Sequence, residues 1–301
     1  MILIISNNNE RTTLKVIQWL LDMKKDFIRI HEDEVFEIKT ENKQVFLKSD
    51  RSSFFLDDIT SVWYRRGRLK IKRLKYDNAS VNAHMNEVQH WLEDYVRKTL
   101  ESKKHINKES NSDINKLLVL EQAKKAGLEV PEYFLADNTE QVSLHKTIIK
   151  TIGGNPILDD IDTDLNGIMY TTTIHHKEKT DFFITFFQEQ IDKEFEIRTF
   201  YLNGKCYSMA IFSQNDKQTK TDFRKYNFKK PNRNIPYILP SHIEEKIDVL
   251  MRTLDLNCGS LDFIKCKEGK FFFLEVNTIG QFLGLSNICN YSLDKEIAEY
   301  L

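Results

Sequence analysis

Near the C-terminus, two apolar runs that flank a turn signal constrain the fold more than any other part of the sequence. The runs span residues 259–267 and 270–277, and the Glu-Gly pair between them is typical of a tight hairpin turn. A two-residue turn in such a hairpin sets Asp262 directly opposite Glu275. Because like charges repel at facing positions, this pairing favours a cation between the two carboxylates.

An asparagine extends this acidic pair along the second strand. Side chains alternate along a strand, so Glu275 and Asn277 share one face, where both offer oxygen to a hard cation. The alternative is an edge hairpin whose acids simply face water, and a slip of one residue would turn Glu275 to the opposite face. Because the acid pair, the asparagine and a Gly-Gln exit at 280–281 occur together, we predict a metal site of Asp262, Glu275 and Asn277.

Hydrophobic periodicity predicts an α/β N-terminal region. We expect a strand at 1–6, a helix near 12–23, strands near 27–30, 34–40, 44–48 and 59–64, and a helix from about 80 to 101. The polar segment 102–113 is the best linker candidate, with a boundary near residue 110. Beyond it, Asp113 or Asn115 caps a helix of about 117–126 that ends at Gly127.

The composition describes a folded protein and gives no sign of a nucleic-acid or membrane partner. The 301 residues carry a net charge of −1, and no window approaches the roughly twenty apolar residues of a membrane span. Four cysteines show no Cys-x-x-Cys spacing, which indicates reduced thiols rather than a disulfide or zinc site. The N-terminus lacks the features of a signal peptide, so we expect a cytoplasmic protein of two or three lobes.

The sequence Leu-Glu-Val-Asn at 274–277 resembles the C-terminal magnesium motif of ATP-grasp enzymes, which an Asp on the neighbouring strand usually precedes. Most members carry Pro after this Asn; Thr278 stands there in this chain and removes no metal ligand. The longer pattern Leu-Glu-Val-Asn-x-x-Gly-Gln-Phe, together with Ser-Val-Trp-Tyr-Arg-Arg-Gly at 61–67, is similar to graspetide synthetases. These peptide-maturing ATP-grasp ligases include microviridin ligases and the grasp-with-spasm maturases, and the resemblance spans nearly the whole chain.

The resemblance implies an α/β (α+β) protein with the ATP-grasp fold. An N-terminal pre-grasp α/β lobe with its linker takes residues 1–110, a central ATP-grasp lobe takes 111–187, and a C-terminal lobe with the metal site takes 188–301. In this fold the last two lobes enclose the nucleotide. The implied cofactors are ATP and Mg²⁺, with two ions expected.

By the same resemblance, the nucleotide site is assembled from the middle of the chain. Two lysines contact the phosphates and the loop 151–154 closes over them. Our candidates for these lysines are Lys116 and Lys150, with Lys108 and Lys146 as rivals of the first. The backbone at the end of an apolar strand hydrogen-bonds the adenine edge, and a nearby acid reaches the ribose hydroxyls. The residues predicted for these tasks are Gln188, Glu189 and Ile191 for adenine, and Glu196 or Glu194 for ribose. The alternative is a buried strand that runs into an exposed acidic loop.

Two arginines are the catalytic groups that the resemblance implies. Arg198 resembles the family arginine that holds the γ-phosphate or the acyl phosphate, a task that suits a planar guanidinium. An ion pair of Arg198 with Glu196 or Glu194 is the competing explanation. Arg224 ends an Asp-Phe-Arg stretch similar to that of microviridin-type ligases, where it would clamp a phosphate or a substrate carboxylate.

A basic block, residues 65–75, begins where an apolar strand ends. Such a run is either a solvated face or a patch that attracts phosphate or an acidic peptide. Arg65 and Arg66, together with Asp222, are the predicted substrate contacts.

Together these parts support carboxylate activation. ATP phosphorylates a carboxylate and a hydroxyl or amine attacks the acyl phosphate, so no enzyme nucleophile is required. The resemblance implies a ribosomal precursor peptide with a leader and an acidic core, whose Asp or Glu side chains form macrocyclic esters or amides with Thr, Ser or Lys. Two alternatives stay open: an ATP-grasp carboxylate-amine ligase that adds a free amino acid to a peptide or protein, and a peptide-binding module that has lost turnover. The choice of ester or amide and the question of a homodimer are open too.

Overall fold

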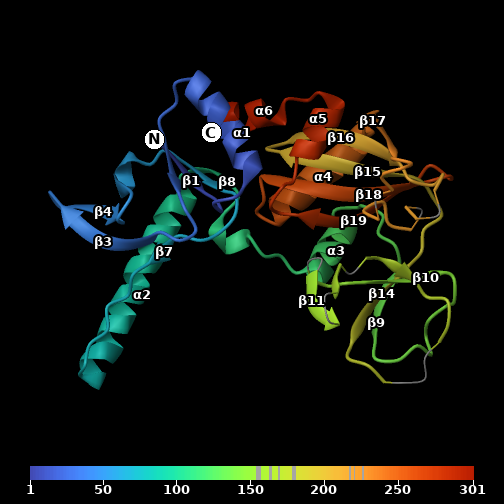
Figure 1. Ribbon diagram of the computed structural model, residues 1–301, viewed down its shortest axis with the longest axis horizontal. Helices are drawn as coiled ribbons and strands as arrows, with labels where there is room; N and C mark the ends of the chain where they lie inside the picture. Colours follow the sequence, from blue (N-terminus) through green and yellow to red (C-terminus); the bar gives the residue numbers. More distant parts are fainter. Residues whose placement is uncertain are drawn as a thin grey trace. The chain divides into compact units, whose positions relative to one another are not determined.

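The protein consists of two compact units (Figure 1). The structure, a computed structural model, describes residues 1–153, 157–162, 165–168, 170–177, 181–216, 218–219, 221–225 and 227–301. The first unit contains Met1–Asp113, Leu256–Cys258 and Ser292–Leu301, and the second contains Ile114–Asp255 and Gly259–Tyr291. The expected division at residues 110 and 187 stays a prediction. The two C-terminal segments of the first unit were not expected there.

A parallel sheet organises the first unit. Its strand order is β2-β1-β6-β8, formed by Phe27–Ile30, Ile2–Ile5, Ser61–Tyr64 and Lys104–Ile106. The strands β1 and β6 are buried along their whole length, as expected of parallel strands covered on both faces. The helices α1 (Arg11–Asp22) and α6 (Leu293–Tyr300) belong to the same unit. The α/β prediction is therefore confirmed.

The polar segment 102–113 is more than a linker, contrary to the prediction. It contains β8 and the short 3-10 helix η2 (Glu109–Asn111). Ile106 of β8 is fully buried and pairs with Trp63 of β6. One buried side chain and the ladder to a neighbouring strand are enough to hold a short edge strand, so the polar composition concealed it.

A second sheet and a long helix complete the first unit. The sheet has the order β5-β4-β3-β7, formed by Ser53–Phe55, Gln44–Lys48, Val35–Glu41 and Lys70–Ile71, and η1 spans Leu56–Asp58. The helix α2 (Ala79–Ser102) begins at Asn78, whose side chain accepts hydrogen bonds from two N–H groups of the first turn. Val96 and Leu100 of α2 pack into the same core as Phe36 and Leu47. The strands predicted at 34–40 and 44–48 and the helix predicted at 80–101 agree with β3, β4 and α2 within one residue, whereas β5 and β7 were not predicted.

The second unit begins with a helix and an antiparallel sheet. α3 (Lys116–Lys125) is capped by Asn115, which accepts hydrogen bonds from the N–H groups of Leu117 and Leu118 at 2.9 and 3.2 Å. The sheet has the order β13-β10-β14-β9, formed by Thr172–Thr173, Thr147–Lys150, Thr185–Glu189 and Tyr133–Ala136. A separate pair is made by β11 (Ile157–Asp162) and β12 (Leu165–Ile168).

A five-stranded sheet carries the other part of the second unit. Its order is β17-β16-β15-β18-β19, formed by Arg233–Tyr237, Lys205–Phe212, Lys193–Leu202, Cys258–Cys266 and Phe271–Asn277. A two-residue turn joins β15 to β16, with Asn203 and Gly204 at φ values of +44° and +89°. In the sequence, helix α4 (Ser241–Thr253) lies between β17 and β18, and helix α5 (Leu283–Cys289) comes after β19. Among the described residues, no helix combines the length and apolar character that crossing a membrane requires.

Candidate active site

β18 and β19 form the hairpin that the sequence predicts, but the turn differs. The Cys266 N–H donates to the Lys270 carbonyl at 3.0 Å, so the loop has three residues instead of the predicted two. Gly269 closes this loop with a φ of +85°, which a residue with a side chain rarely adopts. The longer loop moves the first pairs by one position and sets Phe263 opposite Phe273.

A β-bulge then restores the predicted pairing of the two acids. The register shifts between Asp262 and Phe263, so Leu274 is the extra residue and Asp262 lies opposite Glu275. Without the bulge, Asp262 would face Leu274, and Glu275 would point to the other side of the sheet. Instead, Leu274 and Glu275 line the same cavity as Asp262. The pairing of Asp262 with Glu275 was predicted correctly, whereas the two-residue turn from which it was predicted was not.

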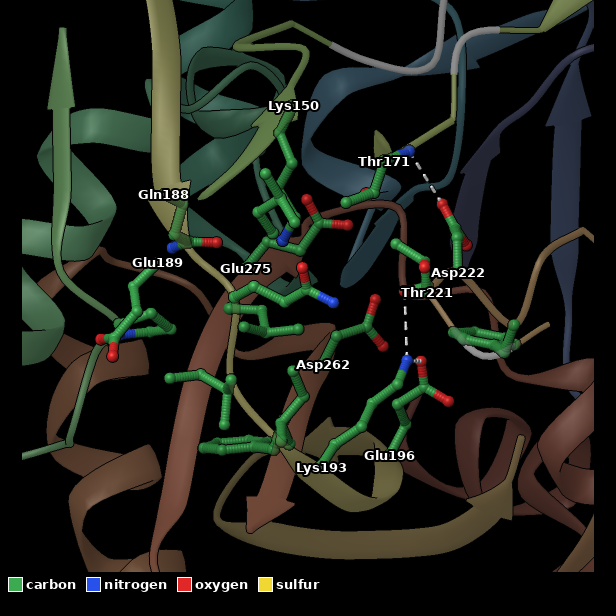
Figure 2. Close-up of a pocket in the computed structure, with 18 of the residues that line it drawn as sticks. Lys150, Thr171, Gln188, Glu189, Lys193, Glu196, Thr221, Asp222, Asp262 and Glu275 are labelled. Carbon is green, nitrogen blue, oxygen red and sulfur yellow. Dashed lines mark hydrogen bonds and ion pairs between the residues drawn. The ribbon is translucent and has the colours of Figure 1, made fainter. Parts of the chain in front are cut away.

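This cavity has a volume of about 280 Å³ and lies within the second unit. The start of α3, the end of β10, the connection from β14 to β15, the loop 221–224 and the strands β18 and β19 contribute to its lining. Figure 2 shows labelled polar side chains from these segments around one space, with Lys150, Asp262 and Glu275 among them.

Most of the residues predicted from the sequence line this cavity. They are Lys116, Lys150, Gln188, Glu189, Ile191, Glu196, Asp222, Arg224, Asp262 and Glu275. Lys146, a rival candidate for the first lysine, also lines it, whereas Lys108 belongs to the first unit. Gly154, the last residue of the predicted phosphate loop, lies outside the described residues.

Four predicted residues are not part of the described lining. Arg198 contacts the cavity through Asp262, and the Asn277 Oδ1 accepts a hydrogen bond from the Ile279 N–H at 3.0 Å. Arg65 and Arg66 lie in the first unit. The Arg65 side chain is almost fully buried, with one Nη 3.5 Å from a Glu10 oxygen, and the Arg66 Nε lies 2.7 Å from the other. The start of the basic block is therefore neutralised in part by Glu10 and is not a plain solvated face.

Lysines surround Glu275. The Lys116 Nζ lies 3.0 Å from a Glu275 oxygen and 3.4 Å from the Thr151 carbonyl. Burial lowers the pKa of Lys150, against the attraction of Glu275. Burial alone would raise the pKa of Glu275, but Lys116 and Lys150 outweigh it and lower that pKa. Glu275 is therefore an ionised carboxylate between two cationic side chains.

Asp262 is held by an arginine on the neighbouring strand. The Arg198 Nη1 donates to both Asp262 oxygens at 2.8 Å. Arg198 does form an ion pair, but the predicted partners Glu196 and Glu194 are wrong. Its partner is Asp262, because β15 lies beside β18 in the sheet. Burial raises the pKa of Asp262 in spite of Arg198, and the facing Glu275 adds to the rise.

Asp222 fixes the position of Arg224. The Arg224 Nε and Nη2 donate to the two Asp222 oxygens at 2.8 and 2.6 Å, and the Thr171 N–H donates to the same carboxylate at 3.1 Å. Asp222 is buried, whereas the Arg224 side chain is one-third exposed. Such a bidentate pair holds the guanidinium in one orientation and leaves part of it open to the cavity.

A buried ion pair beside the cavity was missed by the sequence analysis. The Lys193 Nζ lies 2.5 Å from a Glu196 oxygen and donates to the Thr221 carbonyl at 3.1 Å. The Ser213 Oγ donates to the other Glu196 oxygen at 2.6 Å. Glu194 pairs instead with Lys265 at an exposed site, so Glu196 alone of the two candidates lines the cavity. The i,i+3 spacing of Lys193 and Glu196 gave no signal, because these residues lie on a strand.

Gln188 presents an unused acceptor at the end of β14. Its side chain is 1% exposed, and its Oε1 accepts no hydrogen bond from the described residues. A buried unpaired amide oxygen is costly, so an acceptor in this position suits a ligand with an N–H donor. Glu189, the last residue of β14, and Ile191, on the connection to β15, line the same wall.

The donor set around the hairpin suits a hard divalent cation. Asp262 and Glu275 supply facing carboxylates and Asn277 supplies an amide oxygen two residues on, which are ligands that Mg²⁺ accepts. A cation between the carboxylates would also relieve the repulsion by Glu275, which adds to the effect of burial in raising the pKa of Asp262. Among the described residues, no cluster of three or more His, Cys, Asp or Glu residues is suited to hold a metal ion. The residues present therefore fit Mg²⁺.

Several solved structures share this fold. An ATP-grasp ligase from Chryseobacterium gregarium, associated with ribosomally made peptides and bound to ADP, a leader and a core peptide, has a TM-score of 0.77 at 22% identity; the match covers 99% of this chain and 94% of that chain. The macrocyclase MdnC from Microcystis aeruginosa, bound to the precursor peptide MdnA, has a TM-score of 0.76 at 24% identity and coverage of 100% and 99%. The ATP-grasp ligase PsnB with a precursor variant, Mg and ADP has a TM-score of 0.71 at 14% identity and coverage of 99% and 96%.

These similarities confirm the predicted ATP-grasp fold over essentially the whole chain. No protein-family model and no curated protein matches the sequence.

Proposed function

We propose that this chain is an ADP-forming ATP-grasp ligase that activates side-chain carboxylates of a ribosomal precursor peptide and closes macrocyclic links. One observation carries the proposal: a single cavity sets two facing carboxylates, Asp262 and Glu275, among Lys116, Lys150 and Arg224. Phosphoryl transfer to a carboxylate needs this combination, because charge develops on the transferred phosphate and little covalent chemistry falls to the protein.

The nucleotide lies along the wall from β10 to β15 in this proposal. Lys116 and Lys150 bind the phosphates, and the Gln188 Oε1 and the backbone at Glu189 and Ile191 hold the adenine. Glu196, kept in place by Lys193 and Ser213, accepts hydrogen bonds from the ribose hydroxyls. The unpaired acceptor of Gln188 supports this orientation, since the adenine amino group is a donor.

Asp262, Glu275 and Asn277 are the proposed ligands of Mg²⁺, with two ions expected. When bound, the metal supplies positive charge against the phosphate oxygens. Arg198 orients Asp262 and, with Arg224, offsets charge on the acyl phosphate. A hydroxyl or amine of the same peptide then attacks the acyl phosphate and releases inorganic phosphate.

The substrate is a precursor peptide with a leader and an acidic core that contains Thr, Ser or Lys. The names of the similar structures motivate this choice, because the Chryseobacterium ligase is bound to a leader and a core peptide and MdnC is bound to a precursor peptide. Arg65, Arg66 and Asp222 are proposed substrate contacts, Asp222 through its hold on Arg224. The reaction is proposed to take place in the cytoplasm, in keeping with four cysteines that lack disulfide or zinc spacing, and a homodimer is the proposed assembly.

Mass spectrometry tests the proposal directly. A candidate precursor encoded beside the gene, with an acidic and Thr-rich core, is incubated with the protein, ATP and Mg²⁺. We expect the loss of one water for each ring closed, with ADP and phosphate as the other products. A mass gain equal to an amino-acid residue would assign the chain to the ordinary carboxylate-amine ligases, and AMP with pyrophosphate would contradict the acyl-phosphate mechanism.

A matched pair of lysine variants checks that turnover comes from this cavity. Lys150→Met removes a half-buried amine that the proposal places against the phosphates, so we expect loss of ring closure. Lys43→Met removes an exposed lysine from the turn between β3 and β4 and should leave turnover unchanged. Retained peptide binding without turnover in the wild-type protein would indicate the peptide-binding module instead.

A further inference from the structure

Lys116 and Glu275 form an ion pair inside the candidate active site. The Lys116 Nζ lies 3.0 Å from a Glu275 oxygen, and the two side chains are 30% and 28% exposed. Lys116 is the first residue of α3 and Glu275 lies on β19, so the pair depends on the packing of α3 against β19. The ammonium therefore competes for the carboxylate with any metal ion that binds Glu275.

The facing acid, Asp262, is balanced in the same way. Its carboxylate is paired with Arg198, as Glu275 is with Lys116, so the charges of these four groups cancel. Figure 2 shows Asp262 and Glu275 beside the same space, where both line the cavity. A divalent cation that arrives alone thus finds no unbalanced negative charge at the two acids and has to displace one of their partners.

Lys116 is the partner that can move. Its other hydrogen bond within the described residues goes to the Thr151 carbonyl at 3.4 Å, which is long for such a bond. Lys116 and Glu275 also line a second cavity of about 20 Å³, so the ammonium is not packed on every side. Arg198 is less mobile, because its side chain is 17% exposed and its Nη1 donates to both Asp262 oxygens at 2.8 Å. A flexible lysine stem suits an exchange of partners better than a planar guanidinium does.

We propose that Lys116 is a placeholder for the metal ion, so that the nucleotide binds before the metal does. This inference rests on the proposed function, which assigns the phosphates and the metal to this cavity. Without nucleotide, Lys116 holds Glu275. Phosphate groups draw the Lys116 ammonium to themselves and leave the Glu275 oxygens open to Mg²⁺. The exchange couples the two ligands, since each binds more tightly when the other is present.

The size of the effect follows from Coulomb's law. A unit charge and a dication about 4 Å apart repel enough, even at the dielectric constant of water, to weaken binding more than about tenfold. The exposure of the pair keeps the effective dielectric constant near that of water. Removal of the Lys116 charge should therefore tighten metal binding about tenfold in protein without nucleotide.

Binding of Mn²⁺ tests the placeholder without turnover. Mn²⁺ takes the same oxygen ligands as Mg²⁺, and its electron paramagnetic resonance signal counts the free ion. In the absence of nucleotide, Lys116→Met and Lys116→Gln should each bind Mn²⁺ about tenfold more tightly than the wild type, whereas Lys116→Arg keeps the charge and should bind as the wild type does. The matched control is Lys125→Met, which removes an exposed lysine at the other end of α3 and should leave Mn²⁺ binding unchanged.

Titrations with ADP test the order of binding. In protein saturated with ADP, the advantage of Lys116→Met should shrink to less than about twofold, because the phosphates have drawn Lys116 from Glu275 in the wild type. ADP titrated in the presence of EDTA should bind Lys116→Met several-fold more weakly than the wild type. The double variant Lys116→Met, Glu275→Gln should lose the gained Mn²⁺ binding, which assigns that gain to Glu275.

Four results would overturn parts of this reasoning, each in a distinct way. Equal or weaker Mn²⁺ binding by both uncharged Lys116 variants would refute the placeholder, since Lys116 would then only support Glu275. An advantage that survives Glu275→Gln would refute it as well, and one that persists undiminished in ADP would refute the order of binding. A wild-type protein that binds no ADP would contradict the proposed function, while the Mn²⁺ titration without nucleotide would still decide whether Lys116 competes with the metal.

Discussion

The buried ion pair between Lys193 and Glu196 gives a sharp test of the electrostatics of the second unit. The two side chains are 7% and 9% exposed, and their charged atoms lie 2.5 Å apart. Glu196→Ala leaves the Lys193 ammonium with the Thr221 carbonyl, at 3.1 Å, as its remaining partner in the described structure. It also deprives the Ser213 hydroxyl of its acceptor.

Removing one partner of a buried pair costs about 3–5 kcal/mol, which is a large part of a total unfolding free energy of about 5–15 kcal/mol. The double variant Lys193→Met, Glu196→Leu should recover most of this loss. The reason is that burial raises the pKa of Glu196 in spite of Lys193, so desolvation of the carboxylate outweighs the attraction between the two charges. An apolar pair of similar volume carries no such penalty.

Urea denaturation, monitored by amide hydrogen exchange in β15, measures the free energy of unfolding of both variants. The control is Arg252→Ala, which breaks an exposed pair with Asp248 and should cost at most about 1 kcal/mol. A single Glu196 variant that loses less than about 1 kcal/mol, or a double variant that loses as much as the single one, would refute the reasoning.

The same pair predicts a pH dependence with a defined sign. Because the pKa of Glu196 is raised in the folded protein, the stability that its protonation confers is fully present below its unfolded value, near 4.5. That stability is lost as pH rises through the folded pKa. The wild type should therefore lose stability relative to the double variant as pH rises from about 4.5 to 7. A difference between the two proteins that does not change with pH would contradict the assignment.

Three further changes test other parts of the second unit. Glu275→Gln should leave the thermal midpoint nearly unchanged yet reduce ATP turnover by more than about a hundredfold, because it removes the charge of a proposed metal ligand; wild-type rates would refute the assignment. Gly259→Ala should lower the free energy of unfolding by about 1–3 kcal/mol, since its Cβ would lie 3.0 Å from atoms of Met251 and Val276; an unchanged urea midpoint would show that β18 can shift. Burial raises the pKa of the Cys206 thiol to about 12, so native protein should react slowly with a thiol reagent at pH 8 and unfolded protein quickly; equal rates would contradict this.

Local patterns determined much of this protein before its tertiary structure was known. Asn203-Gly204 is the kind of pair that favours the two-residue turn between β15 and β16, because residues that tolerate positive φ close such a hairpin. Asn115 was one of two predicted caps of α3, since its short amide reaches the first free N–H groups of the helix. Asp262 was predicted to face Glu275 by counting back from a hairpin turn of two residues, and the two residues are paired although the turn has three. Each of these depends on residues close together in the chain.

Contacts between distant strands could not be predicted in the same way. Arg198 pairs with Asp262 because β15 and β18 are neighbours in the sheet. No residue pattern within β15 indicates that β18 lies beside it. The strand β8 was taken for a linker, since a single buried isoleucine is too weak a signal against a polar background. Arg65 was expected in a basic patch and is buried beside Glu10, a contact between residues 55 positions apart.

The C-terminal hairpin separates the features that local sequence determines from those that depend on contacts between distant residues. The sequence by itself determined that an acid pair and an asparagine lie on two adjacent strands, because composition and alternation are local properties. Only the tertiary structure decided that a three-residue turn shifts the pairs by one position and that a bulge at Leu274 shifts them back. Turn length and bulge have opposite effects on register, so their sum depends on how the whole sheet packs around Asp262 and Glu275.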